Sequence, residues 1–519
     1  MNKNRSTRNR VVVGLVALLL SVGPATAAEP KDPLAGFDEY VQAALADLQV
    51  PGVAVAIIKD GKVVLARGYG TRRIGEAGVV DEQTVFPIAS VTKVFTATCV
   101  ALLVEEGKLK WTDPVVRHLP EFELYDPFLT KDVRMEDLLS HRVCLETADL
   151  AAYRGDLDRA QIIRRLRFMQ PVAPFRSRFS YHNPLLITAG AVLERVDGDS
   201  WENVLRTRLL EPLGMGATFA GPRELKGREN VATPHLFAEG KLIADPMWNR
   251  DHEGFQQLHD AVAPAGAMQS NVLDMAKFLQ MYLDEGAFEG RPLLKPETVR
   301  TMFALHSSVP IVAKPRPNLV YPSFYGGGLG WQLRDLRGRK VIMHGGGSGA
   351  VAAMMPEEKI GLVVLANRGW GAGIEYMLMH DIFARMLGLP RSQTNHDWLV
   401  EAQETPVKEA AARNARLEAA RKRDTKPSLP LSSYAGTYAC DLYGKLEILE
   451  RDGSLRLQFG PNIEGTPVHW ESDTFRAKLT CPPGEEWFLR FQVSAGSVPS
   501  LQVERISWHE PMPEFRRTE

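Results

Sequence analysis

The sequence predicts a body of mixed helices and strands with a mostly antiparallel sheet, followed by a small all-β domain at the C-terminus. Two observations support this fold class, α/β in the broad sense that includes α+β. Helical and strand-like patterns alternate irregularly as far as residue 388. From residue 434 onward, short strand-like runs separated by turn residues replace them. At 519 residues the chain is also long enough for more than one domain.

The composition is that of a soluble globular protein. Hydrophobic residues make up 45% and charged residues 24%, which excludes a collagen-like or mostly disordered chain. With 62 basic and 63 acidic residues, the net charge is −1, so no positive excess is available to neutralise phosphates. We therefore expect no nucleic-acid partner. Four cysteines are too few for a disulfide scaffold or a cysteine-rich zinc module.

Residues 1–27 are predicted to be a secretory signal peptide. Basic residues precede a short apolar run, Val11–Val22, and Ala25-Thr26-Ala27 has the small residues of a cleavage site. The alternative is an uncleaved anchor, but the apolar run is short for a bilayer core of about 30 Å. We expect an exported protein, periplasmic or secreted, with no transmembrane span after cleavage. Disulfides are allowed in that compartment.

Local patterns predict the elements of the body. Strand-like runs Val53–Ile58 and Val63–Gly68 flank Asp60-Gly61, a preferred tight-turn pair, so residues 51–70 are expected to form a hairpin. A helix is expected over Ser90–Glu106, with Gly107 ending it. Further helices are predicted at Asp274–Asp284 and Tyr376–Leu387, and further strands at Lys340–Met343 and Ile360–Leu365.

The composition changes near residue 400. Pro406–Arg423 is rich in Ala, Glu and Arg, which indicates an exposed helix. Two interpretations stay open: a spacer between domains, or a solvated surface helix of the body. Pro427–Pro430 ends this segment, and strand patterns follow. The expected organisation is a body at 35–388, a helical linker at 389–429 and an all-β accessory domain at 430–519.

The cysteines divide into two pairs. Cys440 and Cys481 both lie in the predicted β domain and either form a disulfide or remain thiols, since sequence does not give their geometry. Cys99 and Cys144 are expected to be small buried hydrophobic residues.

The first motif with catalytic potential is Ser90-Val91-Thr92-Lys93 at a helix start. Positions i and i+3 share a helix face, so the amine of Lys93 can reach the hydroxyl of Ser90. A serine hydroxyl becomes a good nucleophile when a neighbouring base takes its proton. Lysine can be that base if burial or nearby charge lowers its pKa. A Ser-x-x-Lys string alone is weak evidence, because such strings occur by chance in a chain of this length.

Two further motifs strengthen the case. In Tyr181-His182-Asn183, a phenol can relay a proton and an amide can hydrogen-bond the substrate. In His344-Gly345-Gly346-Gly347, the glycines follow a strand and allow a substrate backbone to approach. The backbone N–H groups of Gly347 and Ser90 could then form an oxyanion hole. Alone, each motif also fits a structural loop.

The order of these motifs resembles that of the penicillin-recognising serine hydrolases. The similarity is to the class C β-lactamase-like branch, which includes D-Ala-D-Ala carboxypeptidases, D-aminopeptidases and family VIII esterases, and covers about residues 35–388. The tail resembles the accessory C-terminal domain of some members. Supporting phrases are Leu138-Leu139-Ser140-His141-Arg142, Glu211-Pro212-Leu213-Gly214-Met215, Pro264-Ala265-Gly266 and Gly328-Leu329-Gly330-Trp331.

The resemblance implies a role for each motif residue. Ser90 would be the acylated nucleophile, with Lys93 and Tyr181 sharing acid–base work. Asn183 would bind the carbonyl side of the substrate and orient Lys93. His344, Gly346 and Gly347 would line the substrate site. Neither a metal nor a cofactor is implied, and the partner would be a peptide or another small-molecule substrate.

Two departures from the family pattern bear on specificity. Arg142-Val143-Cys144 stands where relatives often carry Thr-Ser-Gly or Thr-Gly, which could reshape the cleft. His344 stands where many relatives have lysine. Histidine is mostly neutral at pH 7, so we expect weaker dependence on a substrate carboxylate. That expectation favours aminopeptidase, amidase or esterase action over β-lactamase or strict carboxypeptidase action.

Three other functions compete with this one. Gly346-Gly347-Ser348-Gly349-Ala350 nearly matches the nucleophile elbow of α/β-hydrolases, but the last glycine is missing and no helical pattern follows. A metallohydrolase is disfavoured because no His-Glu-x-x-His string is present. A penicillin-binding sensor without turnover is disfavoured because all the catalytic residue types are present. The preferred hypothesis is a serine peptidase or amidase on small peptides, with D-residues among the candidates; a carboxylesterase is second.

Overall fold

The computed structural model describes residues 32–518, except for 239, 312–321, 370–371, 392, 482–483 and 507–509. The expected signal peptide at 1–27 therefore lies outside the described residues. Within the described ranges, no helix has both the length and the apolar character needed to cross a membrane.

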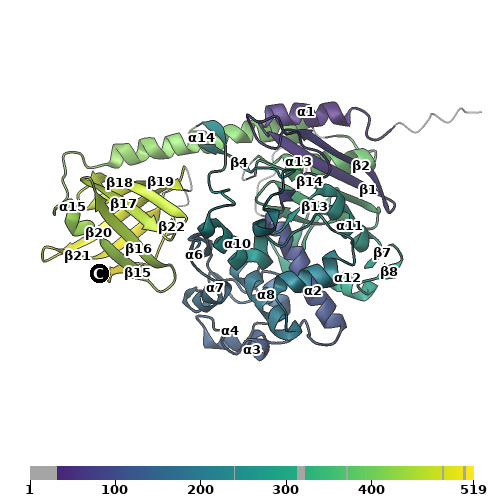
Figure 1. The fold of residues 1–519 in the computed structure, drawn as a ribbon, viewed down its shortest axis with the longest axis horizontal. Helices are drawn as coiled ribbons and strands as arrows, with labels where there is room; N and C mark the ends of the chain where they lie inside the picture. The colour runs from purple at the N-terminus through teal and green to yellow at the C-terminus, as the bar shows by residue number, and fades with distance from the viewer. Residues whose placement is uncertain are drawn as a thin grey trace, which may run out of the picture.

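An eight-stranded antiparallel sheet organises the body (Figure 1). Its strands lie in the order β2-β1-β14-β13-β12-β11-β10-β9, so the N-terminal hairpin pairs with the last strand of the body. The bounds, in chain order, are β1 Gly52–Lys59, β2 Lys62–Gly70, β9 Ser307–Ser308, β10 Tyr325–Gly327, β11 Gln332–Leu336, β12 Arg339–Gly346, β13 Ala350–Met355 and β14 Ile360–Ala366. The hairpin predicted over 51–70 is confirmed.

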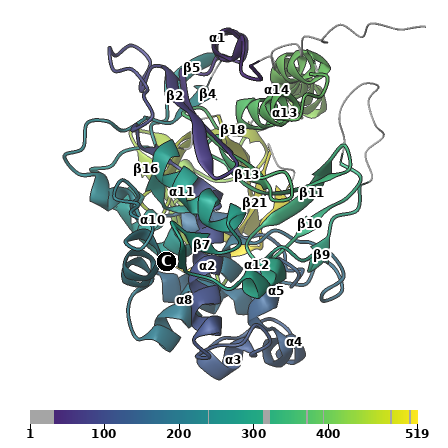
Figure 2. The same cartoon turned by 90° about the vertical axis from the view of Figure 1, so that its right-hand side faces the viewer.

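Helices cover both faces of this sheet (Figure 2). Alternate residues of β1 point to opposite sides: Val53 and Val55 pack in one apolar cluster with α1 and α13, whereas Ala54 and Ala56 join the larger cluster on the other face. Because both faces are buried, the central strands are continuous apolar runs rather than alternating patterns.

The helices and short strands of the body have the following bounds. The α-helices are α1 Phe37–Asp47, α2 Thr92–Glu105, α3 Val115–His118, α4 Pro127–Asp132, α5 Met135–Leu139, α6 Asp149–Tyr153, α7 Arg159–Arg165, α8 Asn183–Asp197, α9 Trp201–Leu205, α10 Glu253–Gly266, α11 Val272–Leu283, α12 Pro296–Met302 and α13 Ile374–Met386. The 3₁₀ and π turns are η1 Ala89–Val91, η2 Leu166–Phe168, η3 Arg206–Leu210 and η4 Pro222–Leu225. The small two-stranded pairs are β3 Phe86–Pro87 with β6 Gln269–Ser270, β4 His235–Ala238 with β5 Lys241–Ala244, and β7 Ala287–Phe288 with β8 Arg291–Pro292.

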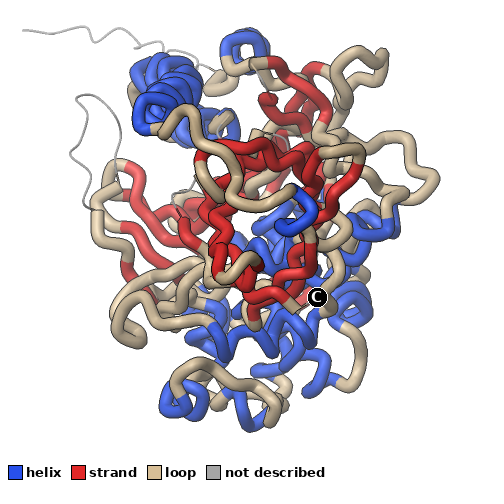
Figure 3. Tube along the Cα trace, turned by 90° about the vertical axis from the view of Figure 1, so that its left-hand side faces the viewer, coloured by secondary structure: helices blue, strands red, loops and turns tan. Residues whose placement is uncertain are grey.

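The C-terminal domain is a closed antiparallel barrel, seen from its own side in Figure 3. Eight strands form the ring, which closes where β20 pairs with β21 and β23 pairs with β15; β22 adds to β21. After the short helix α15 Leu431–Tyr434, the strands are β15 Gly436–Cys440, β16 Gly444–Arg451, β17 Ser454–Phe459, β18 Ile463–Glu471, β19 Thr474–Cys481, β20 Glu486–Ser494, β21 Ser497–Arg505, β22 Glu510–Pro511 and β23 Phe515–Arg517. Closure leaves the ring without a free edge. The predicted fold class, an antiparallel α+β body plus an all-β domain, is confirmed.

Helix α14, Gln393–Ala420, joins the two units (Figure 1). It begins near the start of the predicted helical linker at 389–429, and well before the Ala-, Glu- and Arg-rich stretch that starts at Pro406. Near its beginning, Leu399 packs against the body, and near its end Leu417 packs on the barrel cluster around Trp470. The helix therefore contacts both units, which combines the two interpretations left open by its composition.

The fold determines the burial and the pairing of the cysteines. Cys99 and Cys144 are buried, as expected. Cys440 is a free thiol on β15, and three strands separate β15 from β19, which ends at Cys481. The disulfide alternative is therefore not realised, because the barrel places these strands on different sides of the ring.

Candidate active site

Three chain segments meet at the candidate site. Ser90 lies in the 3₁₀ turn η1, between β3 and α2, and remains partly exposed. Tyr181 and Asn183 lie at the start of α8, and His344 lies near the end of β12. The expected helix over Ser90–Glu106 thus begins with a 3₁₀ turn, which places the serine at its tip.

Lys93 is the nearest polar partner of Ser90. Its Nζ lies 3.0 Å from Ser90 Oγ and donates a 2.6 Å hydrogen bond to the backbone carbonyl of Ala265, at the end of α10. The side chain is fully buried. Burial lowers the pKa of Lys93 to about 7, although the nearby charge of Asp149 acts in the opposite direction. Near neutral pH the amine can therefore lose its proton and accept one from the serine.

Tyr181 lies close to both Ser90 and Lys93. Its phenol is close enough to Ser90 for the serine side chain to influence its pKa, and Lys93 Nζ lies 4.9 Å from its ring centroid. The ring stacks on His141 at a centroid distance of 4.6 Å. Burial raises the pKa of Tyr181 far above its ordinary value, so the residue is a neutral phenol that can donate or relay a proton.

Asn183 forms a hydrogen bond with the carboxylate of Asp149, a residue that was not predicted from the sequence. Its Nδ2 donates a 2.9 Å hydrogen bond to Oδ2 of Asp149, the first residue of α6. The described hydrogen bonds of Lys93 go to Ser90 and Ala265 instead. The carbonyl of Ala265 therefore performs the orienting contact that was expected of Asn183.

His344 is buried and neutral. Its Nδ1 lies 2.8 Å from the carbonyl oxygen of Gly345, and its ring centroid lies 6.5 Å from that of Tyr181. Burial, reinforced by the charge of Lys93, lowers the pKa of His344 to about 3. An uncharged imidazole therefore occupies the position where many relatives carry a lysine.

The glycines after His344 allow β12 to approach η1. A Cβ on Gly346 would lie 2.3 Å from the carbonyl oxygen of Ile88, so only glycine fits there. Ser348 then donates a 2.6 Å hydrogen bond to the carbonyl of Pro87. These contacts hold the turn containing Gly347 beside the segment that leads into Ser90. Ser348 itself lies in a turn between two strands, with its hydroxyl engaged, which is not a nucleophile elbow.

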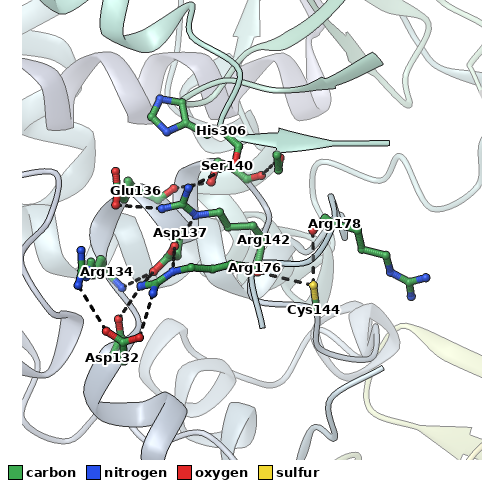
Figure 4. Close-up of polar contacts among 11 residues, drawn as sticks. Asp132, Arg134, Glu136, Asp137, Ser140, Arg142, Cys144, Arg176, Arg178 and His306 are labelled. Atoms are coloured by element: carbon green, nitrogen blue, oxygen red, sulfur yellow. Dashed lines mark hydrogen bonds and ion pairs between the residues drawn. The ribbon is translucent and has the colours of Figure 1, made fainter. Parts of the chain in front are cut away.

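An ion-pair network supports the loops around Tyr181 (Figure 4). The fully buried Asp137 accepts hydrogen bonds from Arg142 at 2.5 Å and from Arg176 at 2.7 Å. Although burial opposes ionisation, the hydrogen bonds from Arg176, the backbone of Arg134 and Arg142 hold the pKa of Asp137 below its ordinary value. The network ties the loop that follows His141 to the segment that leads into Tyr181. Arg142, one of the departures from the family pattern, is thus a structural residue.

Unusual backbone conformations gather around the site. Ala89, His141, Cys144 and Arg176 all have positive φ, between 43° and 64°, although none is glycine. Such conformations cost free energy and persist where the surroundings enforce them. Cys144 has a φ of 64°, a conformation that glycine adopts more readily than cysteine.

Three residues that influence the site, Asp149, Arg505 and Ala265, were not predicted from the sequence. Asp149 carries no recognisable motif, and Arg505 of the barrel acts on the charges of Asp149 and Tyr153 from far along the chain. The only sequence signal at Ala265 is the family phrase Pro264-Ala265-Gly266. Among the described residues, no group of three or more His, Cys, Asp or Glu side chains is placed to hold a metal ion.

The fold and the Ser-Lys-Tyr arrangement define a β-lactamase-type serine hydrolase scaffold. Residues 37–374 match the Beta-lactamase family model, and the chain belongs to this family. Residues 420–519 match a domain of unknown function, DUF3471. The predicted family resemblance is confirmed.

Individual proteins with similar sequences support the same placement. The chain is 28% identical to an unguisins hydrolase, ungD, of Aspergillus violaceofuscus, over 94% of this chain and 90% of that protein. It is 29% identical to penicillin-binding protein 4 of Amycolatopsis lactamdurans, over 68% of this chain and 89% of that protein.

Solved structures share the fold. The octameric penicillin-binding protein homologue from Pyrococcus abyssi aligns with a TM-score of 0.59 at 23% identity, covering 91% of this chain and 98% of its own. EstCE1, a hydrolase with promiscuous acyltransferase activity, aligns with a TM-score of 0.55 at 23% identity, covering 68% of this chain and 98% of its own.

Proposed function

We propose that the protein is a serine peptidase or amidase that acts on small peptides through an acyl-enzyme on Ser90. The observation that carries the proposal is the 3.0 Å contact between Ser90 Oγ and a buried lysine amine whose pKa is lowered to about 7. A base with a pKa near the working pH is well suited to accept the serine proton.

The cycle has two halves. In acylation, Lys93 takes the proton of Ser90 as Oγ attacks the substrate carbonyl, and the backbone N–H groups of Ser90 and Gly347 stabilise the developing oxyanion. The carbon–nitrogen bond then breaks, and the proton passes from Lys93 through Tyr181 to the leaving amine. In deacylation, water attacks the ester carbonyl. It gives up a proton along the same route, and Ser90 regains its own.

The charge state of His344 disfavours substrates with a required carboxylate. The neutral His344 offers no fixed positive charge to a carboxylate on the leaving-group side. A relative that aligns along almost the whole chain is named as an unguisins hydrolase, which supports hydrolase activity in general.

The test compares kcat/KM for a D-alanyl p-nitroanilide and a short-chain p-nitrophenyl ester. Ser90→Ala serves as the blank, and Ser348→Ala, which removes the other serine of the site, is the matched control. We expect anilide cleavage that disappears in Ser90→Ala and persists in Ser348→Ala. Ester turnover without anilide cleavage would instead make the protein a carboxylesterase. Persistence of either activity in Ser90→Ala would refute the nucleophile assignment.

A further inference from the structure

We propose that Asp149 is a specificity residue that binds a protonated amine on the acyl part of the substrate. The inference rests on the proposed function, in which His344 lines the leaving-group side, and on the carbonyl-side position that the family resemblance implies for Asn183. A cation beside Asn183 therefore belongs to the acyl part.

The carboxylate of Asp149 lies at the site without a cation in contact. Its one hydrogen bond among the described residues comes from the amide of Asn183, at 2.9 Å. No described basic side chain lies within ion-pair distance of it. The residue nevertheless keeps some exposure, so a substrate group can reach it. Carboxylates removed from water are usually paired, because an unpaired buried charge is costly.

The surrounding charges show that this carboxylate belongs to the catalytic centre. Burial raises the pKa of Asp149, against the hydrogen bond from Asn183 and the attraction of Lys93 and Arg505. Asp149 in turn acts on the charge of Lys93 and on that of Tyr181. A substrate ammonium bound to Asp149 would thus lie beside the residues that activate Ser90.

The barrel lies next to α6, the helix that begins at Asp149 (Figure 1). Arg505, the last residue of β21, makes a 2.7 Å ion pair with Glu485 of the barrel and attracts Asp149 only at longer range. Asn462 of the barrel donates hydrogen bonds to the carbonyls of Tyr153 and Gly254, which hold the barrel against the end of α6. The barrel thereby lies against the end of α6, and none of its described residues makes an ion pair with Asp149.

A charged amine suits this environment better than a neutral amide. An ammonium donates charge-assisted hydrogen bonds to a carboxylate, and these are strengthened where water is excluded. An N-acylated substrate has no such charge and leaves the carboxylate unpaired. We therefore expect a preference for substrates with a free amino group next to the scissile carbonyl.

The experiment measures binding without requiring turnover. A neutral fluorophosphonate labels Ser90, and racemic alaninamide or its N-acetyl derivative is added at pH 7 to protect the serine. The readout is the concentration of each amide that halves the labelling rate. Asp149→Asn removes the charge, and Glu146→Gln is the matched control, since it makes the same charge change three residues away.

We expect alaninamide to protect the wild type at a concentration at least about tenfold below that of its N-acetyl derivative. In Asp149→Asn, protection by alaninamide should weaken by about tenfold to a hundredfold, and protection by the acetylated amide should change by less than about threefold. Glu146→Gln should behave as the wild type. Asp149→Glu, which keeps the charge, should retain the preference even if the asparagine variant fails to fold.

Two results would overturn the inference, and they are distinguishable. Equal protection by both amides in the wild type, or an equal loss for both in Asp149→Asn, would remove the subsite while leaving the Ser90 hydrolase intact. A wild type in which the fluorophosphonate does not label Ser90 would refute the proposed function, and the subsite with it.

Discussion

Lys93 Nζ lies 3.0 Å from Ser90 Oγ, within a turn that links a short strand to a buried helix. The helix supplies the spacing, because residues i and i+3 share a face. Burial supplies the chemistry, because an amine removed from water holds its proton less tightly. A lysine in the same motif on the surface would remain a cation at neutral pH and would not serve as a base.

The lowered pKa of Lys93 predicts the pH dependence of the reaction. Below pH 7 the amine is protonated and cannot accept the serine proton. For an uncharged ester, kcat/KM should therefore fall about tenfold per pH unit on the acid side and reach a plateau above about pH 8. His344, with its pKa of about 3, does not titrate in this range. A profile of kcat/KM from pH 5 to 9 tests this prediction. If the inflection disappeared in His344→Gln, it would belong to His344, and its assignment to Lys93 would be wrong.

His344→Lys should change the preference for the leaving group. The new ammonium adds a positive charge where the neutral imidazole now lies, and it can pair with a carboxylate. The ratio of kcat/KM for a 3-carboxyphenyl ester to that for the matched 3-carbamoylphenyl ester should rise by about tenfold. The added cation should also lower the pKa of Lys93 and move the acid inflection downward. A strong wild-type preference for the carboxylate would contradict the account of His344.

Asp137→Asn should destabilise the body. The change leaves the guanidinium groups of Arg142 and Arg176 without their shared buried partner, and breaking a buried ion pair typically costs about 3–5 kcal/mol. Chemical denaturation at pH 7 measures the loss. Glu136→Gln is the control: it removes one pair with Arg142 at a more exposed carboxylate and should cost less than about 1 kcal/mol. Similar losses in both variants would refute a central role for Asp137.

The ionisation of Asp137 also predicts how this stabilisation depends on pH. Its pKa is lower in the folded state than the ordinary value of 3.8. The contribution is therefore complete above that ordinary value and is lost as the pH falls through the lower folded pKa. The free-energy difference between the wild type and Asp137→Asn should accordingly shrink in acid, while remaining constant from pH 5 to 8.

Arg154→Met should loosen the barrel from the body. Arg154 is 5% exposed, donates to the carbonyls of Tyr443 and Lys445, and lies 4.7 Å from the ring centroid of Phe459. Removing the guanidinium deletes the hydrogen bonds to these two carbonyls, at a cost of about 1.5–3 kcal/mol each for bonds made by a charged group. Calorimetry should show the barrel unfolding earlier and separately. Arg451→Met, at an exposed barrel position, should leave the unfolding profile unchanged; an unchanged profile in Arg154→Met would refute the interface.

The catalytic motif could be read from the sequence because its geometry is local. Ser90 and Lys93 are three residues apart on one turn, and the hairpin over residues 51–70 follows from a tight-turn pair between two apolar runs. Such features depend on backbone periodicity and turn preference, which neighbouring residues determine. The order of the three motifs then indicated the family, and with it the antiparallel body.

Only the tertiary structure decided how that site is tuned. The carbonyl that orients Lys93 belongs to Ala265, 172 residues away, and Asp149 meets Asn183 across 34 residues. The pKa values of Lys93 and His344 depend on burial, which arises when the helices pack on the sheet. The attraction of Arg505 exists because α14 brings the barrel back against α6. Local sequence determines which groups can react, whereas solvent exclusion and distant charges, which determine how they react, arise only from the packed fold.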